Sequence, residues 1–303
     1  MRDRSNILDG DLLNLHPFSI LARRTRCASA VVILEVMQDI PGVQNIVAIG
    51  SGKGGVGKTT VSVNVAIALS RLGNRVGLLD ADVYGPNVPL MMGVSEAPLT
   101  DGDRIRPIVK EGLRVMSMGF LNPGDKPLVW RGPMLHNVMQ QFLRQVQWGE
   151  LDYLIIDLPP GTGDVQLSLM QSTKLTGAVV VTTPSDVSLE DARKAVNMFH
   201  QVKVPVLGMI ENMSYLIAPQ SKERIDVFGH GAGRKTAEVM NVPFLGELAL
   251  IPEIRKGGDT GKPVALEGPA SEMAAGFYAI AKMVEARCAE VSKISGPTMS
   301  VSD

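Results

Sequence analysis

The fold of this chain is decided by the stretch Gly50-Ser51-Gly52-Lys53-Gly54-Gly55-Val56-Gly57-Lys58-Thr59-Thr60. It contains a complete phosphate-loop pattern, in which Gly52 is followed after four residues by Gly57, Lys58 and Thr59. The apolar run 46–49 before it is typical of a buried parallel strand, and the run 61–69 after it suits a helix packed on a sheet. A strand, a glycine loop and a helix in this order present backbone N–H groups to a polyphosphate.

The residue types in this loop predict a site for ATP and Mg²⁺. Glycines leave the backbone bare, so a triphosphate can approach the N–H groups closely. We expect Lys58 to reach the β and γ phosphates as a catalytic residue, and Thr59 to ligate Mg²⁺. The nucleotide-binding residues expected here are Gly52, Lys53, Gly54, Gly55, Val56, Gly57, Lys58, Thr59 and Thr60.

Polar residues that follow predicted strands extend this site. Asp157 ends an apolar strand and is followed by a loop rich in proline and glycine, while Asp80 and Asp82 follow another strand. We expect Asp80 and Asp157 to belong to the Mg²⁺ shell. Asp82 is expected to orient the attacking water, because phosphoryl transfer needs positioning and charge neutralisation. The alternative is that such carboxylates cap helices. Asn212 suits contact with a purine edge, or a cap or turn.

The rest of the chain alternates between strand and helix patterns, which predicts an α/β fold with a mostly parallel sheet and helices on both faces. We expect one ATPase domain over 41–290, preceded by a poorly ordered or short helical extension, 1–40, and followed by a loose tail, 291–303. The further expected strands are 76–79, 113–118, 153–157, 177–182 and 206–210, and the helices are 131–147, 186–201 and 270–290.

Composition limits the function classes. With a net charge of −1 and a pI near 6.5, the chain predicts no general affinity for nucleic acid or for an acidic membrane. Two cysteines, Cys27 and Cys288, are too few for a disulfide framework, and both are expected to be inert. Acidic residues in the first 40 positions favour a cytoplasmic location, with the mitochondrial matrix as the alternative.

The second lysine of the loop, Lys53, has its own significance. Held at the mouth of the loop, it would point away from its own phosphates and could reach the nucleotide of a partner in a face-to-face homodimer, as a catalytic group supplied in trans. The alternative is a solvated surface lysine. The form Lys-Gly-Gly-Val-Gly-Lys-Thr resembles the deviant Walker A ATPases, which include MinD, ParA, the nitrogenase iron protein and the Mrp group.

Longer stretches resemble one family within that group, the Mrp/ApbC iron–sulfur cluster carrier ATPases, over about residues 40–285. The resemblance implies a P-loop NTPase that forms a homodimer, hydrolyses ATP slowly and delivers a [4Fe–4S] cluster to apoprotein clients. It also implies that adenine contacts Asn212 and the segment Pro252-Glu253-Ile254. The matching stretches are 80–89, 116–120, 129–134, 157–167, 211–215 and 228–231.

The chain departs from this family pattern at the cluster ligands. Typical members carry Cys-x-x-Cys just after the stretch 211–215, where two pairs from two subunits supply four thiolates. Here the stretch reads Ala218-Pro219-Gln220-Ser221, so Ala218 and Ser221 provide no such ligand. Three functions stay open: a carrier with altered ligands, a positioning switch of the MinD or ParA kind, and a nucleotide-switched scaffold that no longer binds cluster.

Overall fold

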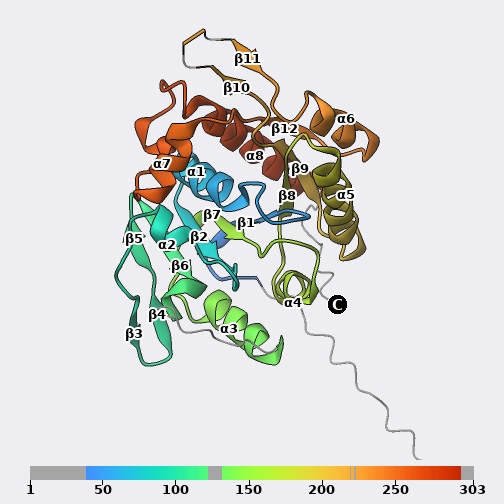
Figure 1. Ribbon diagram of the computed structural model, residues 1–303. Coiled ribbons are helices and arrows are strands. Elements are labelled where there is room, and N and C mark those ends of the chain that lie inside the picture. Colours follow the sequence, from blue (N-terminus) through green and yellow to red (C-terminus); the bar gives the residue numbers. More distant parts are fainter. Residues whose placement is uncertain (1–38, 122–131, 219, 222, 295–303) are drawn as a thin grey trace, which may run out of the picture. The chain divides into compact units, whose positions relative to one another are not determined.

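An eight-stranded sheet forms the centre of the protein, seen in a computed structural model that describes residues 39–294 apart from 122–131, 219 and 222 (Figure 1). Every neighbouring pair of strands is parallel except β5 and β6, which confirms the predicted mostly parallel α/β P-loop fold. The strands in spatial order are β12 (Phe244–Glu247), β9 (Val206–Glu211), β8 (Gly177–Thr182), β1 (Val43–Gly50), β7 (Leu151–Asp157), β2 (Val76–Asp80), β6 (Leu113–Ser117) and β5 (Ile108–Lys110).

Helices cover both faces of the sheet, because side chains alternate along each central strand. In β1, Val47 and Ile49 point into one core, while Ile46 and Ala48 point into the other. The first core is closed by α1 (Lys58–Arg71), α2 (Val88–Met91) and α8 (Ala275–Ile294). The second is closed by α3 (Gly132–Arg144), α4 (Asp164–Ser172), α5 (Asp186–Gln201) and α6 (Ala232–Val239).

Smaller elements lie around this sandwich. Two short hairpins, β3–β4 (Leu99–Asp101 and Arg104–Arg106) and β10–β11 (Leu216–Ile217 and Arg224–Ile225), are separate from the main sheet. Figure 1 shows the β10–β11 hairpin standing out from the helical layers. The remaining elements are η1 (Met118–Leu121), α7 (Pro252–Asp259) and η2 (Val264–Glu267).

The predicted boundaries hold within three residues except at the last helix. The last helix was expected over 270–290 but runs from Ala275 to Ile294, so it enters the segment expected as a loose tail. The extension occurs because Val291 continues the apolar stripe of Val284 and Cys288 and packs against the same core. Helix α3 stops at Arg144, where Gln145 turns to pair with Ile105.

Little of the predicted N-terminal extension falls within the described residues. The predicted extension, 1–40, lies outside the described residues apart from its last two positions, of which Ile40 is buried in the second core. None of the helices in the described part of the chain has the length and apolar character needed to cross a bilayer.

Candidate nucleotide site

The phosphate loop joins β1 to α1 and is shaped by the absence of side chains. A Cβ on Gly57 would lie 2.2 Å from Asn212 Nδ2, and one on Gly52 would lie 2.0 Å from the backbone oxygen of Asp191 in α5. Gly57 also has φ +79 as the residue that precedes α1, a conformation that L-residues rarely adopt. The loop is therefore a close-fitting cradle that only glycine permits at these two positions.

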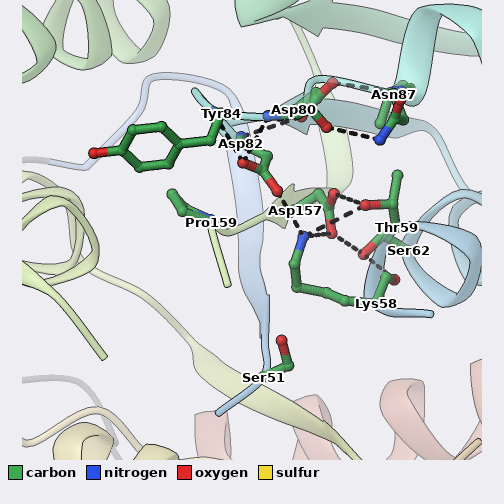
Figure 2. Close-up of polar contacts among 12 residues, drawn as sticks. Ser51, Lys58, Thr59, Ser62, Asp80, Asp82, Tyr84, Asn87, Asp157 and Pro159 are labelled. Atoms are coloured by element: carbon green, nitrogen blue, oxygen red, sulfur yellow. Dashed lines mark hydrogen bonds and ion pairs between the residues drawn. The ribbon is translucent and has the colours of Figure 1, made fainter. Parts of the chain in front are cut away.

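Lys58 and Thr59 meet Asp157 at the start of α1 (Figure 2). The Lys58 ammonium lies 2.9 Å from Asp157 Oδ1, and the Thr59 hydroxyl donates to Asp157 Oδ2 at 2.7 Å. Ser62, one turn further along α1, donates to Asp157 Oδ1 at 2.6 Å. All these groups are of the types that bind Mg²⁺ or phosphate oxygens. Ser62 was not among the expected site residues, although its position three residues after Thr59 places it on the same helix face.

Asp80 stands beside Asp157 because their strands are in register. β2 pairs with β7 so that Asp80 and Asp157 are Cα partners at the carboxyl ends of both strands. Asp80 is fully buried and accepts hydrogen bonds from the Ser117 hydroxyl at 2.8 Å and from the backbone N–H of Val88 at 3.2 Å. Burial, and then repulsion from Asp157, raise the pKa of Asp80 to about 7. A divalent cation would relieve that repulsion.

The two oxygens of the Asp82 carboxylate have different partners: one accepts backbone hydrogen bonds, and the other lies near Lys58. Oδ1 accepts from the backbone N–H groups of Tyr84 at 3.2 Å and Gly85 at 3.3 Å, which fixes the loop after β2. Oδ2 lies 3.8 Å from the Lys58 ammonium and faces the phosphate loop. Asp82 therefore combines a turn role with an oxygen directed at the site, which suits the water-orienting role that the sequence predicts.

A cavity of about 510 Å³ extends from the phosphate loop to the start of α7. At the loop end it is lined by Lys53, Gly54, Gly55, Val56, Gly57, Lys58, Thr59, Thr60 and Asp82. Asp80 and Asp157 are outside this lining, although they belong to the hydrogen-bonded group around Lys58 and Asp82. Gly52 is also outside it and serves to bring the loop against α5.

Asn212 lines the cavity beside the phosphate loop, where its Nδ2 donates to Val56 O at 2.8 Å and ties this strand end to the loop. From the start of α7 and the residue before it, Ile251, Ile254 and Arg255 line the cavity. Pro252 and Glu253, which the resemblance had indicated together with Ile254, are exposed and outside the lining. The reason is helical geometry, since α7 begins at Pro252 and turns one side of its first turn to solvent.

Comparison with known proteins places the chain in a family. The model of a ParA-type family, the NUBPL iron-transfer P-loop NTPases, matches residues 42–285. The chain belongs to this family. A Deinococcus radiodurans protein named iron-sulfur cluster carrier protein is 53% identical over 255 residues, which are 84% of this chain and 72% of that protein. The Mus musculus iron-sulfur cluster transfer protein NUBPL is 44% identical over 279 residues, 91% of this chain and 87% of that one.

Solved structures agree with this assignment and with the fold. A nucleotide-binding protein from Archaeoglobus fulgidus in complex with ADP has a TM-score of 0.66 and 36% identity, covering 75% of this chain and 90% of that one. The septum site-determining protein MinD from Pyrococcus horikoshii with Mg-ADP has a TM-score of 0.59 and 26% identity, covering 82% and 99%. The resemblance to iron–sulfur carriers, predicted from the sequence, is thus confirmed at the level of the family.

The lysine that gives the deviant loop its character, Lys53, lies at the cavity edge of this NUBPL-family chain. Its side chain is partly buried, and within the described residues it takes part in no hydrogen bond or ion pair. The neighbouring Ser51 hydroxyl instead donates to the backbone oxygen of Lys53 at 2.9 Å, which holds the main chain. The Lys53 ammonium is therefore not engaged by the phosphate loop of its own chain.

The positions where typical family members carry the cysteine pair lie on the β10–β11 hairpin. Ala218 is partly buried and Ser221 is exposed, and the hairpin is closed by Ala218 N–H donating to Glu223 O at 2.9 Å. In the described part of the chain, no three His, Cys, Asp or Glu side chains are grouped so that they could hold a metal ion. Cys288 is buried in α8, and burial raises the pKa of its thiol to about 12, so it is no thiolate ligand at neutral pH.

Proposed function

We propose that this protein is an ATP-hydrolysing iron–sulfur cluster carrier or assembly factor. One observation carries the ATP part: in a chain of the iron-transfer family, Lys58, Thr59, Asp157 and Asp82 converge around a glycine cradle. These residues fit Mg²⁺ and a triphosphate by charge, by ligand type and by the space that the glycines leave open.

Each residue has a defined part in the proposed hydrolysis. Lys58 neutralises phosphate charge, Thr59 and the carboxylates of Asp80 and Asp157 hold Mg²⁺ directly or through water, and Asp82 orients the attacking water. Bound Mg²⁺ would supply further charge neutralisation at the phosphate oxygens. The backbone N–H groups of the loop are already ordered for the phosphates, since the glycine cradle is held by α5 on one side and Asn212 on the other.

The same proposal includes a homodimer in which Lys53 reaches the nucleotide of the partner. Its support is the position of Lys53 at the cavity edge, with an ammonium that no described residue engages. Light scattering with ATP on the unmodified protein and on Lys53→Ala tests this. We expect the variant to bind nucleotide as a monomer and to lose ATP-dependent dimerisation; unchanged dimerisation would remove the role in trans.

Of the proposed roles, binding of an iron–sulfur cluster has the least support from the described residues. Ala218 and Ser221 replace the thiolates of typical members, and Cys288 is buried. This favours a second candidate function, a nucleotide-switched scaffold for cluster proteins that holds no cluster itself. Structural likeness to MinD keeps a positioning switch as a third possibility in terms of fold alone.

Anaerobic reconstitution separates the first two functions. Iron and sulfide would be quantified on the unmodified dimer and on an Ala218→Cys, Ser221→Cys double variant, followed by transfer to an apoprotein client. Cluster retained and transferred by the unmodified chain supports a carrier with other ligands. Cluster retained only by the double variant supports the scaffold, and co-sedimentation with liposomes or DNA in the presence of ATP would indicate the positioning switch.

The proposed partners are a second copy of the chain and iron–sulfur apoproteins, with neither nucleic acid nor membrane. The cytoplasm is the proposed location, with the mitochondrial matrix as the alternative. The Deinococcus radiodurans carrier protein aligns with this chain at 53% identity, and an Arabidopsis thaliana protein named as mitochondrial and required for NADH dehydrogenase aligns at 45%. Fractionation of cells that express the tagged chain distinguishes the two locations.

A further inference from the structure

One buried side chain next to the site has no part in the functions described above. Gln166 lies in the first turn of α4 and is 1% exposed. Its Nε2 donates a hydrogen bond to the backbone oxygen of Pro159, seven residues earlier. Pro159 follows Asp157 by two residues and lies beside Asp82 in Figure 2. Gln166 therefore holds the chain at the point where it leaves the Mg²⁺-binding carboxylate.

The segment that Gln166 holds forms part of the wall at the phosphate end of the cavity. Pro160 lines the cavity, and Gly161 N–H donates to the backbone oxygen of Ser51, in the phosphate loop, at 3.0 Å. A Cβ built on Gly161 or Gly163 would meet no atom within 4 Å, so side-chain packing restrains these two positions little. Leu158 is anchored in the second core, whereas polar contacts such as those of Pro159 and Gly161 hold the loop that follows it, 159–163.

The oxygen of the Gln166 side-chain amide, Oε1, is in an unusual environment. Its Oε1 is buried and has no hydrogen-bond partner among the described residues, although buried polar atoms are nearly always paired. A buried acceptor without a partner is costly, and a loop movement that brings a backbone N–H to Oε1 would remove that cost. The Gln166 amide thus uses its nitrogen to hold Pro159, while its oxygen has no partner among the described residues.

We propose that Gln166 is a positioning residue for ATP hydrolysis, which fixes loop 159–163 against the phosphate end of the cavity through Pro159. This inference rests on the proposed ATPase function. Gln166 does not line the cavity, and neither does its partner Pro159, so Gln166 acts through the loop and should affect the rate of hydrolysis more than nucleotide affinity.

The test uses Gln166→Met, which keeps the length of the side chain and removes both amide atoms. Amide hydrogen exchange at Gly161, measured without nucleotide, should become about five-fold faster, which is what the loss of one ordinary hydrogen bond is worth. With ATP, kcat should fall by about ten-fold or more, because the loop is misplaced. The Kd for Mg·ADP should stay within about two-fold, because the phosphate loop is unchanged.

Two further variants make the test specific. Gln166→Asn keeps an amide but is one methylene shorter, so it should show the same losses even if the methionine variant folds poorly. Gln140→Leu in α3 is the matched control, because both amide atoms of Gln140 are also buried without a partner among the described residues. It should change neither Gly161 exchange nor kcat.

Several outcomes would overturn the proposal. Unchanged Gly161 exchange in both Gln166 variants means that the residue does not position the loop. Faster exchange with an unchanged kcat means that the loop position does not matter for hydrolysis. Equal effects in Gln140→Leu mean that the cause is general destabilisation. An unmodified protein without ATPase activity would overturn the proposed function instead, while the exchange measurement would still decide whether Gln166 positions the loop.

Discussion

Replacing Gly57 by alanine tests the close fit of the phosphate loop. The new Cβ would be 2.2 Å from Asn212 Nδ2, and the backbone at φ +79 is strained for any L-residue. The left-handed conformation costs about 1–2 kcal/mol. The displaced Asn212 amide also loses its bond to Val56 O, which is worth about 0.5–1.5 kcal/mol, so the total loss of unfolding free energy is about 2–3 kcal/mol.

A matched variant separates the two contributions. Gly55 has φ +82, but a Cβ there meets no atom within 4 Å, so Gly55→Ala carries only the backbone strain. In thermal unfolding without nucleotide, Gly57→Ala should melt about 1–6 °C below Gly55→Ala, since the lost bond of about 0.5–1.5 kcal/mol is the difference and 1 kcal/mol corresponds to about 2–4 °C in a domain of this size. Calorimetry should also show weaker Mg·ATP binding for Gly57→Ala, because Asn212 has left its place.

A double-mutant cycle gives the result that would refute this reasoning. In an Asn212→Ala background the clashing Nδ2 is gone, so Gly57→Ala should cost no more than Gly55→Ala does. If Gly57→Ala and Gly55→Ala melt together in the unmodified background, or if Asn212→Ala leaves the difference between them intact, the contact between Gly57 and Asn212 does not limit the loop.

Three further predictions address the site and its surroundings. Asp82→Ala should bind Mg·ATP with nearly unchanged affinity, hydrolyse it at least ~10-fold more slowly and accumulate dimer, because phosphoryl transfer depends on a positioned water. A phosphate-release assay that shows the unmodified rate would contradict the water-orienting role of Asp82. The pKa of Asp80 is raised to about 7, so folding favours its protonated form, and this group lowers the free energy of unfolding as the pH rises from about 4 to 7. Asp80→Asn should therefore flatten the dependence of melting temperature on pH in this range, measured without Mg²⁺. An identical slope in the variant would argue against the raised pKa. Cys288, with its pKa raised to about 12, should react with iodoacetamide at pH 8 only after unfolding, as followed by mass spectrometry of the peptide that contains it; rapid labelling of the folded chain would show that the thiol is accessible.

The sequence predicted the central strands well because their signals are local. Apolar runs such as 177–182, bounded by turn residues, gave strand β8 at its observed limits, and Ser185 before 186–201 gave α5. Strand β12 was not predicted, because Phe244–Glu247 is short, ends in a charge and contains Gly246 at φ +148. It is a strand only because β9 offers it a pairing edge, and that requires tertiary structure.

Some residues of the candidate site could also be predicted from local sequence, whereas others depend on tertiary structure. The glycine spacing and the strand-end positions identified Lys58, Thr59, Asp80 and Asp157 without any structure. The segment Pro252-Glu253-Ile254 was indicated by resemblance; the structure brings Ile254 to the cavity, together with Ile251 and Arg255, but leaves Pro252 and Glu253 outside its lining. Which side of α7 faces inward depends on how that helix docks, and its own eight residues do not encode this clearly.

By itself, the sequence determined the phosphate loop, the type of fold and the family, because each is written in residue types at short, fixed spacings. Tertiary structure alone decided that Asp80 and Asp157 are register partners, that Asn212 holds Val56, and that Gln166 holds Pro159. The physical reason is that these contacts join residues from separate segments, whose meeting depends on strand order, register and helix docking. Those are set by the burial of the whole sheet and by no local pattern.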